Sequence, residues 1–277
     1  MGRALVLGGG GVTGVAWELG LLAGLAADGV DLTGADLIVG TSAGSVVAAQ
    51  ITSGVSLPDL FAGQLAQPGG EATARMGPLL LGRWVWTMLS TRNPATVGVR
   101  LGRLATSAAT MPEAERRAVI AARLRVQDWP DRRILLTAVD AATGERVAFD
   151  RDSGVPLVDA VGASCAVPGV WPPVTIGGRR FIDGGVRSPA NADLAAGCDP
   201  IVVIAPIPRG YGPVAAVATQ VAALRRQATV VAVSPDRAAR AAIGRNVLDP
   251  ARRGAAARAG WTQAATVVDT VAAAWLS

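Results

Sequence analysis

A run of four glycines, residues 8–11, constrains the fold most, because it lies between two apolar stretches of different periodicity. Residues 3–7 are a short apolar run typical of a buried strand, whereas residues 12–27 carry apolar side chains at helical spacing. The same order recurs when residues 36–39, a predicted strand, run into a tight turn and a predicted helix over residues 45–52. Two such units near the start of the chain indicate an α/β fold.

Strands and helices continue to alternate along the chain, which predicts a layered α/β fold with helices on both sides of a sheet. The further predicted elements are a helix at 113–124, strands at 133–139 and 146–149 joined by a hairpin-type turn, a helix at 156–165, and strands at 180–182 and 200–205.

The length of 277 residues, with 51% hydrophobic residues, suits one large domain spanning residues 1–277. Residues 54–111 are rich in Gly, Pro and Arg, and we expect an irregular insertion or lid there. Residues 213–277 are alanine-rich and predicted to be mostly helical. Neither segment carries a signal for a domain boundary.

The absence of two residue types restricts the chemistry. The chain has no histidine, and its 26 basic residues are all arginine. A Ser-His-Asp triad or a Ser-Lys dyad is therefore excluded, and arginine does not give up its proton. A general base must be a carboxylate, with Tyr211, a cysteine or the N-terminus as weaker alternatives.

Charge and cysteine content indicate the compartment and the partners. The net charge of +5 is spread without any block of like charge, so we expect no nucleic-acid partner. Cys165 and Cys198 show no metal-type spacing and predict neither a disulfide framework nor a metal site. We expect a reducing compartment, the cytoplasm. Residues 1–7 are too short for the core of a signal peptide, and residues 76–89, which include Arg83, fall short of the about 20 residues that span a membrane.

A candidate nucleophile lies in Gly40-Thr41-Ser42-Ala43-Gly44, between the strand at 36–39 and the helix at 45–52. Small residues on both sides of a serine allow a strand and a helix to approach closely while the hydroxyl stays accessible, as in a nucleophile elbow. The alternative is a tight strand-helix turn whose serine has no chemical role. The sequence therefore predicts Ser42 as the nucleophile of an acyl hydrolase.

The glycine run and Gly14 offer backbone N–H groups at the N-terminus of a helix, where an anion is favoured. One fitting anion is the oxyanion of a tetrahedral acyl intermediate. Another is a nucleotide pyrophosphate, because Gly9, Gly11 and Gly14 match the dinucleotide fingerprint. That second interpretation needs an acid at the end of the next strand, whereas Asp36 opens that strand.

Asp183 is the candidate base, because a predicted strand delivers it to a turn at Gly184 and Gly185 that permits close approach. The motif alone is an ordinary turn signature. The alternative carboxylates are Asp140, Asp150 and Asp193, each of which is equally interpretable as a turn or cap residue.

Taken together, these motifs resemble those of the patatin-like phospholipases, a family of lipid acyl hydrolases that use a Ser-Asp dyad and no catalytic histidine. The matching segments, which lie within residues 3–205, are Gly8 to Gly14 as the oxyanion loop, Gly40 to Gly44 as the elbow, Ala163-Ser164-Cys165-Ala166-Val167-Pro168 as a proline-containing block, and Asp183-Gly184-Gly185 as the second catalytic motif.

The resemblance implies a three-layer α/β/α fold with a central, mostly parallel sheet. It also implies that the N–H groups of Gly10 and Gly11, with Gly9, hold the oxyanion while Ser42 forms an acyl-enzyme that water cleaves. The implied substrate is a phospholipid or lysophospholipid, and no metal or organic cofactor is implied. The resemblance does not give the oligomeric state.

One departure from the family and one apolar patch leave alternatives open. Thr13 stands where the family commonly has arginine, which leaves the anchoring of the loop or the contact with a head group open, and with it a neutral ester or thioester as substrate. Acyl transfer by the same dyad, or a non-catalytic lipid- or nucleotide-binding module, are the other hypotheses. Residues 76–89, with Trp84 and Trp86, suit either a lipid-facing lid in peripheral contact with a membrane or a core helix.

Overall fold

The computed structural model describes residues 2–66 and 74–277. Its strands are β1 (Ala4–Leu7), β2 (Leu37–Thr41), β3 (Arg133–Asp140), β4 (Arg146–Phe149), β5 (Val174–Ile176), β6 (Arg179–Asp183), β7 (Ile201–Ile204) and β8 (Val230–Val233). Its α-helices are α1 (Gly11–Ala27), α2 (Ala43–Ile51), α3 (Leu57–Leu65), α4 (Pro78–Leu89), α5 (Pro94–Ser107), α6 (Glu113–Arg123), α7 (Leu157–Ser164), α8 (Val217–Leu224), α9 (Arg237–Ile243) and α10 (Arg253–Trp275).

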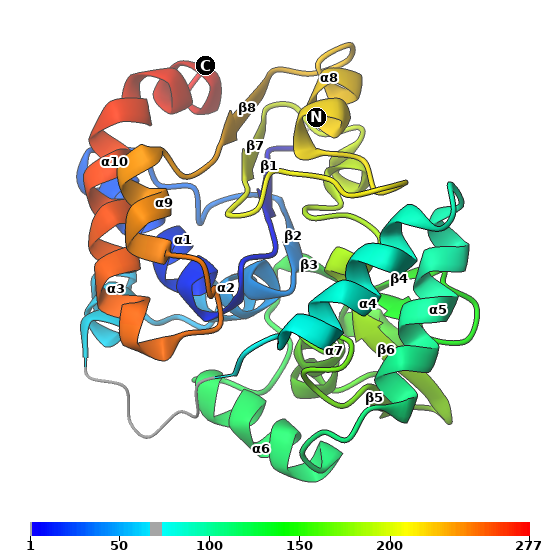
Figure 1. Ribbon diagram of the computed structural model, residues 1–277. Coiled ribbons are helices and arrows are strands. Elements are labelled where there is room, and N and C mark those ends of the chain that lie inside the picture. Colours follow the sequence, from blue (N-terminus) through cyan, green and yellow to red (C-terminus); the bar gives the residue numbers. More distant parts are fainter. Residues whose placement is uncertain (1, 67–73) are drawn as a thin grey trace.

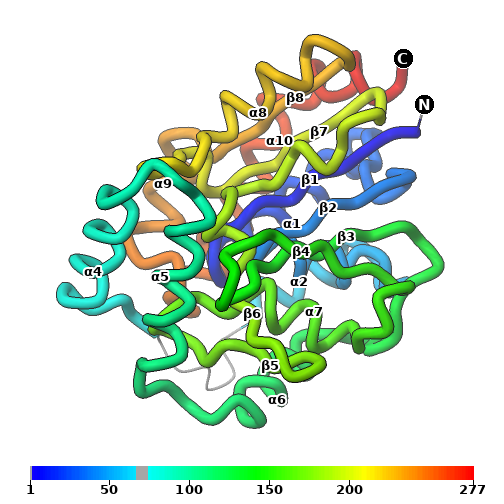
Figure 2. Tube along the Cα trace, turned by 90° about the vertical axis from the view of Figure 1, so that its right-hand side faces the viewer, coloured from blue at the N-terminus to red at the C-terminus, as the bar shows by residue number. Residues whose placement is uncertain are grey.

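The strands form one sheet that is parallel at its centre. β3, β2, β1, β7 and β8 pair in parallel in that order, with β1 in the middle (Figure 2). β4 and β6 are antiparallel to β3, and β5 is antiparallel to β6. Three of these parallel strands, β1, β7 and β8, consist of apolar residues only, as expected for a sheet covered on both faces. This is the α/β fold with a mostly parallel central sheet that the sequence predicts.

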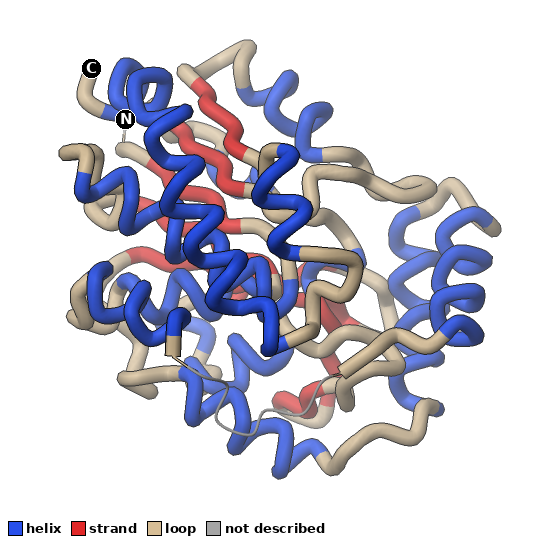
Figure 3. The backbone as a smooth tube through the Cα atoms, turned by 60° about the vertical axis from the view of Figure 1, so that its left-hand side comes forward, coloured by secondary structure: helices blue, strands red, loops and turns tan. Residues whose placement is uncertain are grey.

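Helices cover both faces of the sheet, and β1 shows how the two layers divide. Leu5 and Leu7 point into the larger core, which α1, α2, α7 and α10 complete, while Ala4 and Val6 point into the opposite core beneath α8. A third cluster joins α4 and α5 to β3 and β6 on the α8 side. Figure 1 shows α1, α9 and α10 on one side of the strands and α8, α4 and α5 on the other, and Figure 3 shows the long helices lying over the strands.

Close packing of α1 against α10 anchors the C-terminal segment to the start of the chain. A Cβ atom at Gly20 would lie 2.0 Å from the carbonyl oxygen of Ala257, and one at Gly260 would lie 2.2 Å from that of Trp17. Only glycine allows this approach of the two backbones. Trp17 Nε1 also donates a hydrogen bond to Gln263 Oε1 at 3.1 Å.

The observed elements differ from the predicted ones at three places. Residues 54–111 are not irregular, because their described part forms α3, α4 and α5; residues 67–73 lie outside the described residues. The C-terminal segment is mostly helical, as predicted, but it also contains β8, which extends the sheet beyond residue 205. The predicted elements also omit β5, a short strand paired with β6.

The apolar stretch at 76–89 forms most of α4, a helix that is partly buried and partly exposed. In α4, Met88 is buried, whereas Leu79, Trp86 and Leu89 are exposed. One face of this helix packs on the core and the other faces outward. None of the helices in the described ranges has both the length and the apolar character that a membrane crossing requires.

Candidate active site

Ser42 occupies a sharp turn between β2 and α2. Its backbone has φ 52° and ψ −112°, in the left-handed half of conformational space that residues other than glycine rarely adopt. A Cβ atom at Gly40 would lie 2.7 Å from the Cα of Ser45, and one at Gly44 would lie 2.1 Å from the carbonyl oxygen of Leu7. The two glycines of the motif are therefore required by the close approach of strand and helix.

Two residues at the C-terminal end of α7, Ser164 and Cys165, hold this turn in place together with Ser45. The Ser42 N–H donates to Ser164 Oγ at 2.8 Å, and the Ser42 carbonyl oxygen accepts from Cys165 Sγ at 3.2 Å and from Ser45 Oγ at 2.6 Å. Burial and the nearby Asp183 raise the pKa of the Cys165 thiol to about 11, so it stays protonated and acts as a donor. In the sequence, Ser164 and Cys165 belong to the proline-containing block, which predicts no task for either residue.

The register of β3 brings Asp183 next to Ser42. Thr137 of β3 pairs with Thr41 at the end of β2, and the next residue, Ala138, pairs with Asp183 at the end of β6. β4 pairs with Thr137 and Ala138 along one edge of β3, so β2 and β6 must both lie along its other edge. On that edge, the C-terminal end of β2 meets the C-terminal end of β6. Both chain segments therefore deliver their last residues to the same point of the sheet.

The two side chains meet there. Ser42 Oγ donates to Asp183 Oδ2 at 2.7 Å, and the Gly185 N–H donates to Asp183 Oδ1 at 2.7 Å. Ser42 and Asp183 are both buried. Burial raises the pKa of Asp183 to about 6, against the lowering effect of the hydrogen bonds from Ser42 and Gly185. Asp183 is thus a stronger base than an exposed aspartate and is charged at neutral pH.

The glycine loop lies directly beside Ser42, since a Cβ atom at Gly9 would lie 3.6 Å from Ser42 Cβ. The Gly9 N–H donates to the Pro189 carbonyl oxygen at 2.8 Å and is engaged. The N–H groups of Gly10 and Gly11 have no hydrogen-bond partner within the described ranges and lie at the start of α1. Of the three N–H groups predicted to bind an anion, that of Gly9 is therefore already bonded, whereas those of Gly10 and Gly11 are available to a ligand.

Gly14, Gly184 and Gly185 permit close packing around this centre. A Cβ atom at Gly14 would lie 3.4 Å from both Ala43 and Pro206, and one at Gly184 would lie 2.4 Å from Thr137 Oγ1. One at Gly185 would lie 2.9 Å from Asp183 Oδ1. The contact of Gly184 with β3 therefore requires the absence of a side chain, Gly185 leaves room for the Asp183 carboxylate of its own turn, and Gly14 lies in contact with α2 and Pro206.

Thr13 anchors the loop to the C-terminal segment. Its N–H and its Oγ1 donate to the Val247 carbonyl oxygen at 3.1 and 3.2 Å, and its side chain is fully buried. Gly11 has φ 61°, and a Cβ atom there would lie 2.6 Å from the same oxygen. A small hydroxyl side chain thus provides the loop anchoring that the absence of arginine leaves open.

Asn191 connects the supports of both candidate residues. This buried side chain donates from Nδ2 to Thr41 Oγ1 at 3.1 Å, to Thr137 Oγ1 at 3.2 Å and to the Gly184 carbonyl oxygen at 3.4 Å. Asn191 therefore links β2, β3 and the turn after Asp183 on the sheet face away from α2. No motif in the sequence indicates this role.

The alternative carboxylates have structural tasks elsewhere. Asp140 accepts from backbone N–H groups of its own turn and from Arg179, Asp150 caps the short helix at Arg151–Ser153, and Asp193 pairs with Arg146. Asp36, which a nucleotide site would need near the glycine loop, instead accepts from the Arg3 N–H at the opposite end of β1. No group of three His, Cys, Asp or Glu side chains in the described part of the chain could hold a metal ion.

The sequence matches the family model described as Patatin-like phospholipase over residues 5–196, which include the glycine loop, the elbow and the Asp183 turn. No curated protein matches the chain. Among solved structures it is similar to VipD from Legionella pneumophila, at 12% identity and a TM-score of 0.48, covering 97% of this chain and 67% of that one. It is also similar to the type III effector protein ExoU, at 15% identity and a TM-score of 0.39, covering 97% of this chain and 53% of that one.

The buried carboxylate of Asp183 gives a prediction on stability. Its pKa of about 6 in the folded protein exceeds the ordinary 3.8, so the folded state binds the proton more tightly than the unfolded state does. This contribution to stability is complete below about pH 3.8 and is lost as the pH rises through about 6, which corresponds to about 3 kcal/mol. Asp183→Asn, which cannot ionise, is expected to unfold at higher urea concentration than wild type at pH 8, with the advantage shrinking toward pH 4.

Urea denaturation at pH 4, 6 and 8 checks this expectation, with Asp128→Asn as the control, since Asp128 is exposed. An advantage of Asp183→Asn that does not change with pH, or a wild type more stable than this variant at pH 8, would contradict it.

Proposed function

Because the chain belongs to the patatin-like phospholipase family, we propose that it hydrolyses carboxylic esters of lipids, with Ser42 as the nucleophile and Asp183 as its base. Lipid acyl hydrolysis is the activity of the family as a whole. The observation that carries the assignment of residues is the 2.7 Å hydrogen bond from Ser42 Oγ to Asp183 Oδ2. The substrate class that we favour is a phospholipid or a lysophospholipid.

In the first half of the reaction, Ser42 Oγ attacks the ester carbonyl carbon and its proton moves to Asp183 Oδ2. The tetrahedral intermediate then collapses, the bond to the leaving alcohol breaks, and Asp183 returns the proton to the alcohol oxygen. In the second half, water gives a proton to Asp183 and attacks the acyl carbon. The bond from this carbon to Ser42 Oγ then breaks, Asp183 returns the proton to Ser42 Oγ, and the carboxylic acid is released.

Charge that develops on the carbonyl oxygen needs donors that are fixed in advance. The N–H groups of Gly10 and Gly11 suit this task, because they lie at the start of α1 beside Ser42 and the helix dipole adds positive potential. The bond from Thr13 to Val247 keeps the loop in this conformation. Donors held in place need no reorganisation when the charge appears.

A carboxylate can replace imidazole here because of where it lies. Burial raises the pKa of Asp183 to about 6, close to the range of a histidine, so the group accepts a proton more readily than a solvated aspartate does. The Gly185 N–H holds Oδ1 and leaves Oδ2 directed at Ser42. These contacts support a direct Ser-Asp pair in a chain without histidine or lysine.

We further propose that α4 contacts the surface of a membrane or micelle that contains the substrate. Trp84 Nε1 donates to the Pro168 carbonyl oxygen at 3.0 Å, and Leu80 lies against Gly169, which ties the helix to the segment that follows Cys165. Its outer face exposes large apolar side chains, Leu79, Leu81, Val85, Trp86 and Leu89. Apolar and tryptophan side chains on one face of a helix suit insertion into a lipid interface.

Removing either member of the dyad is expected to abolish turnover. Ser42→Ala lacks the nucleophile and Asp183→Asn lacks the base, so each should reduce kcat/KM for p-nitrophenyl esters and lysophospholipids by about 1000-fold or more. A fluorophosphonate probe should label the wild type and not Ser42→Ala. The control is Ser53→Ala, a serine just after α2 whose hydroxyl bonds to the local backbone. Wild-type turnover in both dyad variants would exclude the proposed pair.

The base should also determine the pH dependence. Asp183 must be charged to accept the proton, so kcat/KM is expected to fall as the pH drops through about 6 and to reach a plateau above it. The measurement is kcat/KM between pH 4.5 and 8.5 for a neutral soluble ester. With no histidine in the chain, an acid limb near pH 6 cannot come from imidazole. Constant kcat/KM across that range would contradict the assignment of the base.

The outer face of α4 should matter only for aggregated substrate. The variant Leu79→Asn/Trp86→Asn removes two side chains that are 87% and 75% exposed. Full transfer of one such side chain from water into an apolar environment is favourable by up to about 1.5–3 kcal/mol. Without these two side chains, we expect binding to lipid vesicles to weaken by about tenfold or more. Co-sedimentation with vesicles measures this, and turnover of a soluble short-chain ester should not change. Leu276→Asn, exposed near the C-terminus and distant from α4 in Figures 1 and 2, is the control. Equal binding of all three proteins would exclude this surface.

A further inference from the structure

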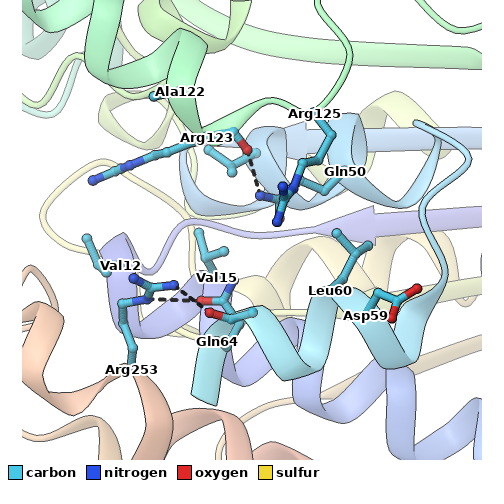
Figure 4. A pocket seen from close by; sticks show the side chains of 12 residues that line it. Val12, Val15, Gln50, Asp59, Leu60, Gln64, Ala122, Arg123, Arg125 and Arg253 are labelled. Carbon is cyan, nitrogen blue, oxygen red and sulfur yellow. Dashed lines mark hydrogen bonds between the residues drawn. The ribbon is translucent and has the colours of Figure 1, made fainter. Parts of the chain in front are cut away.

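A cleft of about 250 Å³ lies next to the glycine loop and has no part in the mechanism above. Its walls come from α1, α2, α3 and the chain around the end of α6 (Figure 4). Val12 of α1, which directly follows Gly11, lines it, and so does Val46 of α2, which lies one helical turn after Ser42. Since each helical residue advances about 1.5 Å, Val46 is only about 6 Å along the axis from Ser42.

The polar lining of this cleft is mainly cationic. Arg123, Arg125 and Arg253 line it, and Asp59 is the one acidic residue among the described residues that do so. Figure 4 shows Arg123 and Arg253 at the end marked by Val12, with Arg125 and Asp59 toward the other end. Two arginine side chains therefore lie at the end next to the glycine loop, where the start of α1 adds positive potential.

The guanidinium of Arg253 is held in a defined position. Its Nε donates to Gln64 Oε1 at 3.2 Å and its Nη2 donates to the Gly63 carbonyl oxygen at 3.1 Å, both on α3. A guanidinium fixed in this way loses little side-chain entropy on binding an anion, and its planar donors suit the oxygens of a phosphoryl group.

Gln50 adds a hydrogen-bond acceptor to the lining. Its Nε2 donates to the Arg123 carbonyl oxygen at 2.9 Å, while its Oε1 is buried and has no hydrogen-bond partner in the described part of the chain. A buried acceptor without a partner is costly, and a hydroxyl or ammonium group of a ligand would satisfy it. The cleft therefore offers cationic donors at one end and an acceptor further in.

We propose that this cleft binds the phosphoryl head group of the acyl substrate, with Arg123 and Arg253 contacting the phosphate and Gln50 accepting from a head-group hydroxyl or ammonium. The inference rests on the proposed function, because it requires the ester to reach Ser42. A protein with such a cleft should prefer a monoacyl glycerophosphate as substrate over a neutral monoacylglycerol with the same acyl chain.

The test compares these two substrates in the wild type and in Arg123→Gln/Arg253→Gln. For the wild type we expect a kcat/KM at least tenfold higher for the phosphorylated substrate. The double variant should lose this preference through a rise in KM of about tenfold or more, with less than a twofold change for the neutral substrate. Arg226→Gln/Arg258→Gln, which removes two exposed charges outside the cleft, is the matched control and should behave as wild type. Equal kcat/KM for both substrates in the wild type, or an unchanged preference in the double variant, overturns the proposal.

Binding to catalytically disabled protein separates this proposal from the proposed function. Ser42→Ala should bind the monoacyl glycerophosphate at least tenfold more tightly than the monoacylglycerol by titration calorimetry, and adding the two arginine substitutions should remove the difference. This result supports head-group binding in the cleft even if the wild-type protein turns over neither substrate. A lack of turnover would refute the proposed function but not the proposed binding site. Inorganic phosphate is the second ligand. If it binds Ser42→Ala as tightly as the monoacyl glycerophosphate does, the cleft is a site for free anions and the head-group assignment is wrong.

Discussion

The turn at Ser42 is the constraint around which the rest of the site is arranged. A residue other than glycine at φ 52° and ψ −112° is strained by about 1–3 kcal/mol, and such strain persists only where the surroundings over-determine the conformation. Here the Ser42 N–H and carbonyl oxygen are both bonded to buried side chains, and Gly40 and Gly44 let the flanking backbones close around the turn. The strain has a chemical consequence, because it turns the hydroxyl away from the helix that begins at Ala43 and toward Asp183.

Strand β3 converts this local turn into a two-residue site. Side chains alternate along a strand, so Thr137 and Ala138 face opposite sides of the sheet. The Thr41–Thr137 pair faces the side where Asn191 bonds both hydroxyls, and the Asp183–Ala138 pair faces the side of α2, where Ser42 lies. A shift of one residue in the β2–β3 or the β3–β6 pairing would put Asp183 on the opposite face of the sheet from Ser42. The polar network around Asn191 therefore stabilises the register on which the Ser42–Asp183 contact depends.

Much of this could be predicted where the signal is local. The strand, glycine turn and helix at the start of the chain, and the elbow at Ser42, follow from periodicity and from glycine positions. Residues 54–111 are expected to be irregular because they are rich in Gly, Pro and Arg, with a helix only as one alternative at 76–89. Yet Pro78 and Pro94 are each the first residue of a helix, where a missing N–H costs nothing. β8 was missed because four apolar residues in an alanine-rich context form a strand only through pairing with β7.

The supports of the site could not be predicted, because they act across long sequence distances. Ser164 bonds to a residue 122 positions away and Asn191 to one 150 positions away, and no short motif encodes such contacts. The absence of histidine and lysine limits the predicted base to a carboxylate, and the glycine turn that follows Asp183 then favours this residue over the other carboxylates. That prediction comes from chemistry and a local motif, not from a long-range contact.

The C-terminal segment is a whole region whose contact with the site could not be predicted from the sequence. It carries no recognised motif and lies outside the family match, yet its Val247 carbonyl oxygen receives both donors of Thr13 and approaches Gly11 so closely that a side chain there would collide. The glycine contacts between α1 and α10 hold the same segment against the helix that the loop begins. A donor pair for an oxyanion is effective only when its geometry is set before the charge develops. The last part of the chain therefore belongs to the site in a physical sense, because it fixes the backbone that the first part presents.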